Sequence, residues 1–209
     1  MARRWATGRT EAFSDGVFAI AITLLVLDLR VPSDEFHDLT AGILHQWPAY
    51  LGYATSFITI GGIWLSHHSI FARLRYVNAQ VMRLNLALLL TVSFLPYPTR
   101  LVAEAIRDAD AERTAVIFYG LALSAVSLTI GALWAAVLRD RELLERDVSE
   151  QEINAVTRIA APNVGLHLGV TALAIFAPRA AAFFYLVVAF ISVFRARGDD
   201  GRLAVDERG

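Results

Sequence analysis

The stretch that decides the fold is RTEAFSDGVFAIAITLLVLDLRV, residues 9–31. It holds an uninterrupted apolar run from Gly16 to Leu27, and a compact polar group precedes this run: Arg9, Glu11, Ser14 and Asp15. About 20 helical residues cover the roughly 30 Å hydrocarbon core of a bilayer, because each residue rises about 1.5 Å. The stretch therefore predicts a first membrane-spanning helix whose polar residues lie where the bilayer begins.

The composition places the whole chain among membrane proteins. Hydrophobic residues make up 56% of the 209 residues, the mean hydropathy is +0.49, and apolar stretches recur along the sequence. The absence of cysteine excludes disulfides, thiolate metal ligands and cysteine nucleophiles. The net charge of −1 argues against a nucleic-acid partner, because such a surface needs an uncompensated basic patch. We therefore expect a multi-pass protein of the lipid bilayer.

Six apolar segments are expected to span the membrane as helices. They cover residues 10–29, 49–66, 82–101, 115–138, 159–177 and 180–194. The predicted fold class is an all-α membrane protein with one domain over residues 1–198, followed by a polar, disordered C-terminal tail over 199–209. Pro96 and Pro98 predict a kink or helix end late in the third span. Pro178 and Arg179 predict a tight hairpin between the last two spans.

The distribution of arginine predicts the orientation of the chain. One side of the membrane would carry the N-terminus, the second and fourth loops and the tail, which contain Arg3, Arg4, Arg9, Arg73, Arg75, Arg83, Arg139, Arg141, Arg146, Arg195, Arg197 and Arg202. The opposite loops are richer in acid, with Asp34, Glu35, Asp38, Glu104, Asp108, Asp110 and Glu112. Because cytoplasmic loops carry the excess of basic residues, both termini are predicted to be cytoplasmic.

The first helix has two distinct faces. At 100° per residue, Ile20, Leu24 and Leu27 fall on one apolar stripe, while Asp15 lies about 140° from Ile20. The stripe is extended by Phe13, Val17 and Val31. It either faces lipid or neighbouring helices, or forms a hydrophobic pore constriction, which gates by its bore and by dewetting.

Asp15 needs partners at its own depth, because an unpaired carboxylate at the hydrocarbon boundary is costly. The second span returns toward the cytoplasm and ends in His67 and His68, while the third starts there with Arg83 and Asn85. We therefore predict a cluster, called the polar knot below, that joins Arg9, Ser14 and Asp15 to His67, His68 and Asn85. The polar knot either holds the first helix in register or makes the protein pH-sensitive through histidine protonation.

No residue pattern in the chain predicts a metal centre, a cofactor site or an enzyme. His67 and His68 are adjacent and point about 100° apart on a helix, which does not suit two ligands of one ion. His167 is expected to form a hydrogen bond within the bundle, with a proton relay as the alternative. A phosphate-binding loop of the GxxxxGK[ST] type requires lysine, which the chain lacks. Gly61, Gly62, Gly120 and Gly131 predict close helix packing.

The residues Arg9-Thr10-Glu11-Ala12-Phe13-Ser14-Asp15 match R-x-x-x-F-S-D. This motif resembles the first-helix signature of the transmembrane protein 175 family, the endolysosomal potassium channels of animals and their bacterial relatives. The continuation GVFAIAIT, residues 16–23, is similar to the bacterial version, and the six-span layout covers the chain except for its tail. The resemblance implies a multi-pass protein of the cell (plasma) membrane of a bacterium.

The resemblance also implies a pore. In that family the first helices surround the pore, and their hydrophobic side chains form a constriction that favours potassium over sodium. The matching positions here are Ile20, Leu24 and Leu27, with Thr23 beside them. Animal members carry two six-span repeats, so this single-repeat chain would form a homotetramer. The family's Phe-Ser-Asp segment resembles a packing brace, which adds Phe13 to the polar knot.

Three functions compete at this point. The first is a passive potassium-selective channel without a cofactor, whose permeant ion is K+. The second is a proton-coupled carrier or proton leak that uses the Asp15/His67/His68 cluster. The third is a membrane-embedded enzyme or scaffold, for which the sequence contains no catalytic constellation.

Overall fold

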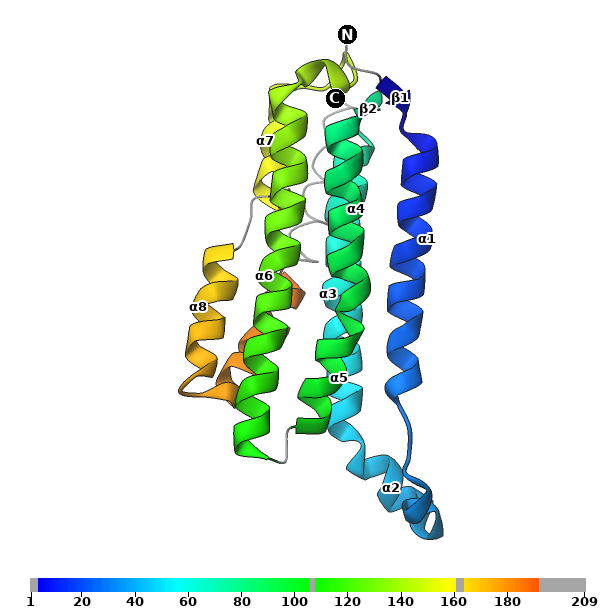
Figure 1. The fold of residues 1–209 in the computed structure, drawn as a ribbon, viewed down its shortest axis with the longest axis vertical. Coiled ribbons are helices and arrows are strands. Elements are labelled where there is room, and N and C mark those ends of the chain that lie inside the picture. The colour runs from blue at the N-terminus through cyan, green and yellow to red at the C-terminus, as the bar shows by residue number, and fades with distance from the viewer. Residues whose placement is uncertain (1–3, 106–107, 161–163, 192–209) are drawn as a thin grey trace, which may run out of the picture.

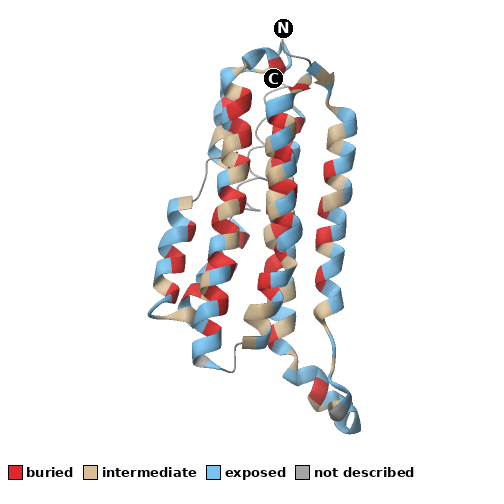
Figure 2. Cartoon of the chain, viewed as in Figure 1, coloured by how far each residue is buried: buried red, intermediate tan, exposed pale blue. Residues whose placement is uncertain are grey.

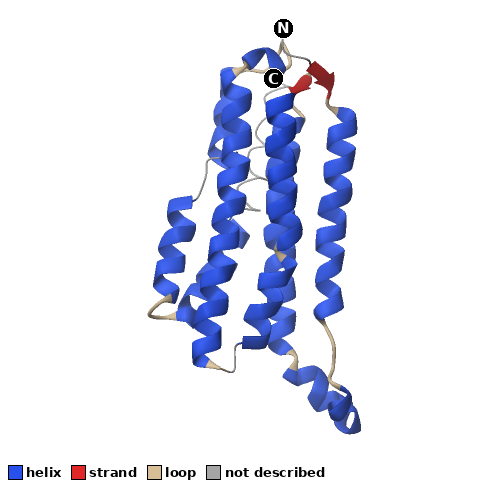
Figure 3. Cartoon of the chain, viewed as in Figure 1, coloured by secondary structure: helices blue, strands red, loops and turns tan. Residues whose placement is uncertain are grey.

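The protein, described by a computed structural model over residues 4–105, 108–160 and 164–191, is a bundle of helices (Figure 3). The longest helices run side by side along one axis, and α1 stands at the edge of the bundle (Figure 1). Two strands of three residues each, β1 (Arg4–Ala6) and β2 (Tyr76–Asn78), pair antiparallel at one end. These strands are a small addition to the predicted all-α fold.

The first half of the chain crosses the bundle twice. Helix α1 (Gly8–Leu24) tightens into the 3-10 turn η1 (Leu25–Asp28). The connection to the next long helix contains η2 (Ser33–Asp38) and α2 (Leu39–His45), which extend beyond the bundle (Figure 1). Helix α3 (Trp47–Phe71) then returns along α1, with Pro48 in its first turn, where a missing N–H costs no helical hydrogen bond.

The third predicted span is broken where its prolines predicted a break. Helix α4 (Ala79–Phe94) ends before Leu95, and α5 (Pro96–Ala105) begins at the proline. Proline has no N–H and its ring clashes with the preceding turn, so one continuous helix cannot pass through residue 96 without a kink. At the other end, the Asn78 side chain accepts hydrogen bonds from the backbone of Gln80 and Val81 and caps α4.

The second half of the chain is built on one long helix, α6 (Ala109–Arg139), whose N-terminus is capped by the Asp108 side chain. After the turn η3 (Arg141–Leu143), helix α7 (Glu150–Ala160) packs against α3 and α6. Helix α8 (Val164–Ala174) and the helix Pro178–Ile191 follow, separated by a three-residue turn that forms the predicted hairpin. Because α6 begins at residue 109, Asp110 and Glu112 belong to its first turn and not to the loop where the sequence placed them.

Three helical stretches in the described part of the chain are long and apolar enough to cross a membrane: Gly8–Asp28, Ala79–Ala105 and Asp110–Arg139. The second predicted span corresponds to α3, which has 25 residues but is interrupted by polar side chains. The fifth predicted span differs most, because residues 159 and 160 end α7 and α8 has only 11 residues. Helix α8 and the helix Pro178–Ile191 extend only about 16 and 21 Å at 1.5 Å per residue. The tail predicted over 199–209 lies outside the described residues.

The core of the bundle lies between α4, α6 and their neighbours, where α6 packs against α4, α5 and α8. Its fully buried side chains include Leu88, Val92, Val116, Leu133 and Val137. Figure 2 shows these buried residues along α4 and α6, while much of α1 is exposed. One side of α1 therefore has no partner among the residues that the structure describes.

Three of the segments predicted to share the arginine-rich side, the N-terminus, the second loop and the fourth loop, lie at one end of the bundle, while the tail lies outside the described residues. Arg4 forms ion pairs with Asp140, at 3.5 Å, and with Glu142, and these connect the N-terminus to the loop after α6. The backbone N–H of Arg75 donates to the carbonyl of Leu143 at 2.8 Å, which joins the loop after α3 to the same place. These contacts hold together the N-terminus, the loop after α3 and the loop after α6, which are distant in sequence.

The glycines predict a matched pair of stability effects. A Cβ at Gly120 would overlap the Tyr185 hydroxyl and Thr171 Oγ1, whereas a Cβ at Gly61 would meet nothing within 4 Å. The expectation of close packing is therefore wrong for Gly61. Gly120→Ala should lower the free energy of unfolding by about 1–3 kcal/mol through overpacking. Gly61→Ala should be neutral or stabilise by up to about 1 kcal/mol, because alanine favours helix. Thermal unfolding in detergent compares the two; equal shifts would contradict the packing described here.

Candidate functional site

Helix α1 presents one buried and one exposed face. Its buried residues are Ser14, Phe18 and Ala21, on the side that packs against α3 and α4. Ile20 and Leu24 on α1 and Leu27 on the following turn η1 are exposed, with exposed fractions of 60, 43 and 54%. About half of each side chain is thus left uncovered by the described residues, and contiguous exposed apolar surface of this kind marks an interaction site. The stripe is therefore available to lipid or to other copies of the protein.

Thr23 lies beside this stripe and is exposed as well. Its hydroxyl donates to the backbone carbonyl of Ile20, one turn earlier, at 3.0 Å. This hydrogen bond to the backbone uses the only proton of the Thr23 hydroxyl and leaves the lone pairs of its oxygen free.

Within the polar knot, the structure joins Ser14, Asn85 and His67 in one buried chain of hydrogen bonds. The amide nitrogen of Asn85 donates to Ser14 Oγ at 2.9 Å, and Ser14 in turn donates to the carbonyl of Thr10 at 2.8 Å. His67 Nε2 lies 2.9 Å from Asn85 Oδ1. An amide oxygen can only accept, so Nε2 carries the proton in this contact. The chain of bonds ties α1 to α3 and α4 at one depth.

Aromatic rings surround His67. Its imidazole stacks on Phe71, with ring centroids 4.2 Å apart, and lies 5.4 Å from the ring of Phe18 on α1. The second ring nitrogen, Nδ1, is buried and forms no hydrogen bond with the described residues. His67 is therefore held on one edge by Asn85 and on its faces by apolar contacts.

Asp15 is paired differently from the sequence prediction. Its Oδ1 accepts a 2.9 Å hydrogen bond from the indole Nε1 of Trp64, and not from a histidine. His68 instead lies 3.6 Å from a carboxylate oxygen of Glu11 and stacks on Trp64, with centroids 5.6 Å apart. These contacts form a second link between α1 and α3, next to the first.

Two residues of the polar knot lie outside these contacts. Arg9 and Phe13 are exposed, and no hydrogen bond or ion pair within the described residues joins Arg9 to the others. The predicted polar knot included neither Trp64 nor Glu11, although Glu11 belongs to the polar group that precedes the apolar run. The signal was present, since Trp64 precedes His68 by four residues and an indole N–H is a natural donor to a carboxylate at the same depth.

His167 meets its partner inside the second half of the bundle. Its Nδ1 lies 2.9 Å from Ser127 Oγ on α6, and both side chains are buried. In the part of the chain that the structure describes, no three His, Cys, Asp or Glu side chains are grouped as metal ligands. The candidate site thus combines an exposed apolar surface on one side of α1 with hydrogen bonds that join α1 to α3 and α4.

Removing the Trp64 donor should weaken the link between α1 and α3. Trp64→Phe keeps the aromatic contact with His68 but leaves the half-buried Asp15 carboxylate without its indole partner, so we expect a loss of about 1–2 kcal/mol in unfolding free energy. Trp47→Phe, at an exposed tryptophan, is the matched control and should shift the thermal unfolding midpoint very little. Similar shifts in the two variants would contradict a stabilising role for the Asp15–Trp64 bond.

Comparison with known families gives this geometry a context. The family model described as endosomal/lysosomal potassium channel TMEM175 matches residues 9–96, the part that contains α1, α3 and α4. A protein named potassium channel from Streptomyces collinus is 42% identical over 157 residues, which cover 73% of this chain and 74% of that protein. An animal relative from Gallus gallus, named endosomal/lysosomal proton channel TMEM175, is 34% identical over 146 residues, but these cover only 29% of its length.

Solved structures agree with the sequence matches. The crystal structure of a lysosomal potassium-selective channel TMEM175 homolog from Chamaesiphon minutus is 36% identical and superimposes with a TM-score of 0.81, over 91% of this chain and 97% of that one. A channel named MtTMEM175 shares 22% identity with a TM-score of 0.63, which supports the fold alone. Its fold, its first-helix motif and its relatives together show that this chain belongs to the TMEM175 family of ion channels.

Proposed function

We propose that four copies of this chain assemble into a passive, potassium-selective channel with α1 around the central axis. The observation that carries the proposal is the exposed stripe of Ile20, Leu24 and Leu27 on a helix at the edge of its own bundle. Four such stripes facing one axis would bury each other's apolar surface and form a narrow hydrophobic constriction. Thr23 would lie beside it and add hydroxyl oxygens to the wall.

The preference for potassium has a physical direction in such a pore. An ion that passes apolar side chains must keep its water or lose part of it, and the more weakly hydrated K+ sheds water more easily than Na+. Relatives from Streptomyces collinus and Chamaesiphon minutus are named potassium channels, which supports the same choice. No bound cofactor takes part in this mechanism.

In this proposal the contacts of the polar knot brace the pore helix. The hydrogen bonds that Ser14 accepts from Asn85 and that Asp15 accepts from Trp64 hold α1 against α4 and α3. Because the helix is rigid, these bonds also fix its rotation and thus the direction in which the opposite face, with Ile20, points. The ion path and the conspicuous carboxylate of Asp15 would thus lie on different sides of α1.

The alternative is a proton leak or proton-coupled carrier. Two observations favour keeping it: animal relatives are named proton channels, and the buried His67 has a ring nitrogen without a hydrogen bond among the described residues. Proton movement through Asp15, His67 and His68 would make flux depend on a pH gradient. We propose the plasma membrane of a bacterium as the location in either case, with both termini in the cytoplasm.

Reconstitution of the purified chain in liposomes tests the proposal. With an outward K+ gradient, we expect K+ efflux and a membrane potential that follows the potassium gradient alone. A pH-sensitive dye inside the vesicles reports the alternative, since a proton pathway would acidify or alkalise the lumen in step with flux. Light scattering should give a protein mass of about 92 kDa, four chains of 23.0 kDa. A monomer, or vesicles without K+ flux, would refute the channel.

A further inference from the structure

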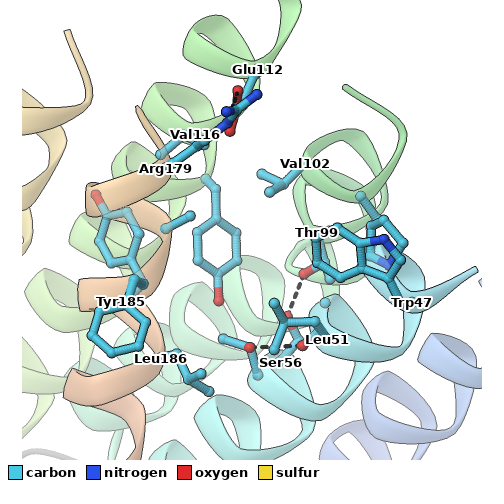
Figure 4. A pocket seen from close by; sticks show the side chains of 17 residues that line it. Trp47, Leu51, Ser56, Thr99, Val102, Glu112, Val116, Arg179, Tyr185 and Leu186 are labelled. Atoms are coloured by element: carbon cyan, nitrogen blue, oxygen red, sulfur yellow. Dashed lines mark hydrogen bonds and ion pairs between the residues drawn. The ribbon is translucent and has the colours of Figure 1, made fainter. Parts of the chain in front are cut away.

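We propose that each chain contains a second site, separate from the pore helix, that binds an uncharged, lipid-soluble molecule with a carbonyl group. The site is a cavity of about 600 Å³ between α3, α5, α6 and the helix Pro178–Ile191. This volume lies within the 300–1,000 Å³ of small-molecule pockets in general. Figure 4 shows its lining, with Glu112 and Arg179 at one end and Ser56 with Thr99 at the other.

The walls of the cavity are apolar, and its rim lies at the surface of the bundle. Val102, Val116 and Leu186 contribute apolar wall. Leu51 on α3 and Phe183 on the helix Pro178–Ile191 also line it, and both are exposed at the surface. Access between two exposed apolar side chains favours a ligand that arrives from the hydrocarbon phase.

The charges of the cavity cancel each other. Among its lining residues only Glu112 and Arg179 are charged, and Arg179 Nε lies 3.4 Å from Glu112 Oε2. Glu112 is buried, whereas the Arg179 side chain is 79% exposed, so the pair closes one end of the cavity. A charged ligand would meet no uncompensated partner inside, and its desolvation would disfavour binding. The occupant should be neutral.

One hydroxyl proton in the cavity is left for a ligand. The hydroxyl of Tyr119 is buried and forms no hydrogen bond of normal geometry within the described residues, although Ser56 and Thr59 are close enough to interact with it. A buried phenol without a partner is an unsatisfied donor, which native structures rarely leave. An acceptor with good geometry, from outside the described chain, would satisfy it.

The neighbouring hydroxyls have their protons already in use. Thr99 Oγ1 donates to the carbonyl of Leu95 at 2.9 Å, so Ser56 is the donor in its 2.5 Å contact with Thr99. Thr55 donates to the carbonyl of Leu51 at 2.8 Å. Tyr185 has Thr171 Oγ1 at 2.7 Å, and Thr171 in turn donates to the carbonyl of His167. Tyr119 is thus the one hydroxyl of the lining that can donate to a ligand, and a ketone, quinone or amide carbonyl would accept from it.

Benzophenone is a suitable probe, because it is neutral, apolar and carries one carbonyl that attaches to nearby C–H bonds under ultraviolet light. The purified channel in liposomes is irradiated with benzophenone, digested and analysed by mass spectrometry. We expect adducts concentrated on cavity residues such as Val102, Val116 and Leu186. Adducts scattered over lipid-facing residues, without enrichment at the cavity, would overturn the proposal. Because labelling does not measure ion flux, its outcome is independent of the channel proposal.

Competition tests the chemical class. Cyclododecanone should reduce the cavity adducts at least fivefold at a concentration where cyclododecane, which lacks the carbonyl, and dodecanoate, which is charged, have little effect. Equal competition by the hydrocarbon would show that Tyr119 plays no part. This comparison needs only the unmodified protein, so it remains decisive if a variant fails to fold.

Two variants assign the site. Tyr119→Phe keeps the ring and removes the hydroxyl, so it should reduce cavity labelling and abolish the advantage of the ketone over the hydrocarbon. Tyr97→Phe, at an exposed tyrosine on α5 outside the cavity, is the matched control and should leave both unchanged. Val102→Trp should fill the cavity and reduce labelling by every probe. Unchanged labelling in Tyr119→Phe, with an unchanged elution volume, would contradict the proposal.

Discussion

Ile20→Asn is expected to raise potassium conductance and to bring the permeability ratio of K+ to Na+ toward one. The substitution places four amides where the proposed constriction is apolar, so ions can pass while they keep hydrogen-bonded water around them. If the barrier falls by about 1 kcal/mol, the rate of passage rises roughly fivefold. Single-channel current in planar bilayers measures the conductance, and reversal potentials in mixed K+ and Na+ solutions measure the selectivity.

Leu24→Ala should act in the same direction, because it widens the constriction one turn further along α1. The matched control is Leu128→Asn on α6, where the leucine is 60% exposed, the same fraction as Ile20. An asparagine there lies on α6 and not on the proposed pore helix, so it should leave conductance and selectivity unchanged. If Ile20→Asn and Leu128→Asn behave alike, the stripe is a lipid-facing or helix-packing surface and not the wall of a pore.

Asn85→Ala should produce the largest loss of stability among single substitutions near α1. The variant removes the partner of His67 Nε2 and the donor to Ser14, and both of these side chains are fully buried. Stranding them should lower the unfolding free energy by about 1–3 kcal/mol. The loss should appear as a lower midpoint of thermal unfolding in detergent and as earlier dissociation of the oligomer.

Asn154→Ala is the matched control, since Asn154 is an exposed residue of α7. Its midpoint should stay within the error of the unmodified protein. A double variant with Ser14→Ala separates the two bonds: if Ser14 and Asn85 act as a unit, the combined loss will be smaller than the sum of the single losses. Additive losses would mean that the 2.9 Å contact between them contributes little.

The sequence was sufficient to predict the helices that depend on local pattern. Hydropathy located α1, α4 and α6, and the chemistry of Pro96 placed the break after α4. Hydropathy failed for α8, because the single apolar run over residues 159–177 contains both the end of α7 and the short helix α8. Periodicity of hydrophobicity does not report where a chain changes direction.

The sequence is sufficient to predict the depth of the site residues in the membrane, but not how each helix is rotated about its axis. Topology alone brings Ser14, His67 and Asn85 to one level of the membrane, and the structure joins these three. Which side chain meets Asp15 depends on how α3 is turned about its axis, and that angle is set by packing along the whole helix. Trp64 was therefore missed as the partner.

The cavity and the strand pair could not be predicted at all. The cavity results from the mutual placement of four helices, one of them the helix Pro178–Ile191, and no local pattern reports a space between elements. The strands β1 and β2 are three residues each and have no alternation to reveal them. Their pairing depends on the bundle bringing residues 4–6 and 76–78 together.

The hydrogen bond from Thr23 to the Ile20 carbonyl has a consequence for anions. A hydroxyl whose proton is held by its own backbone can present only lone pairs to whatever passes it. In the proposed tetramer, four such oxygens would surround the axis next to the apolar constriction. A cation would find electron density there, while chloride would find neither a donor nor a positive charge, so the proposed pore wall would discriminate by the sign of the ion before it discriminates by size.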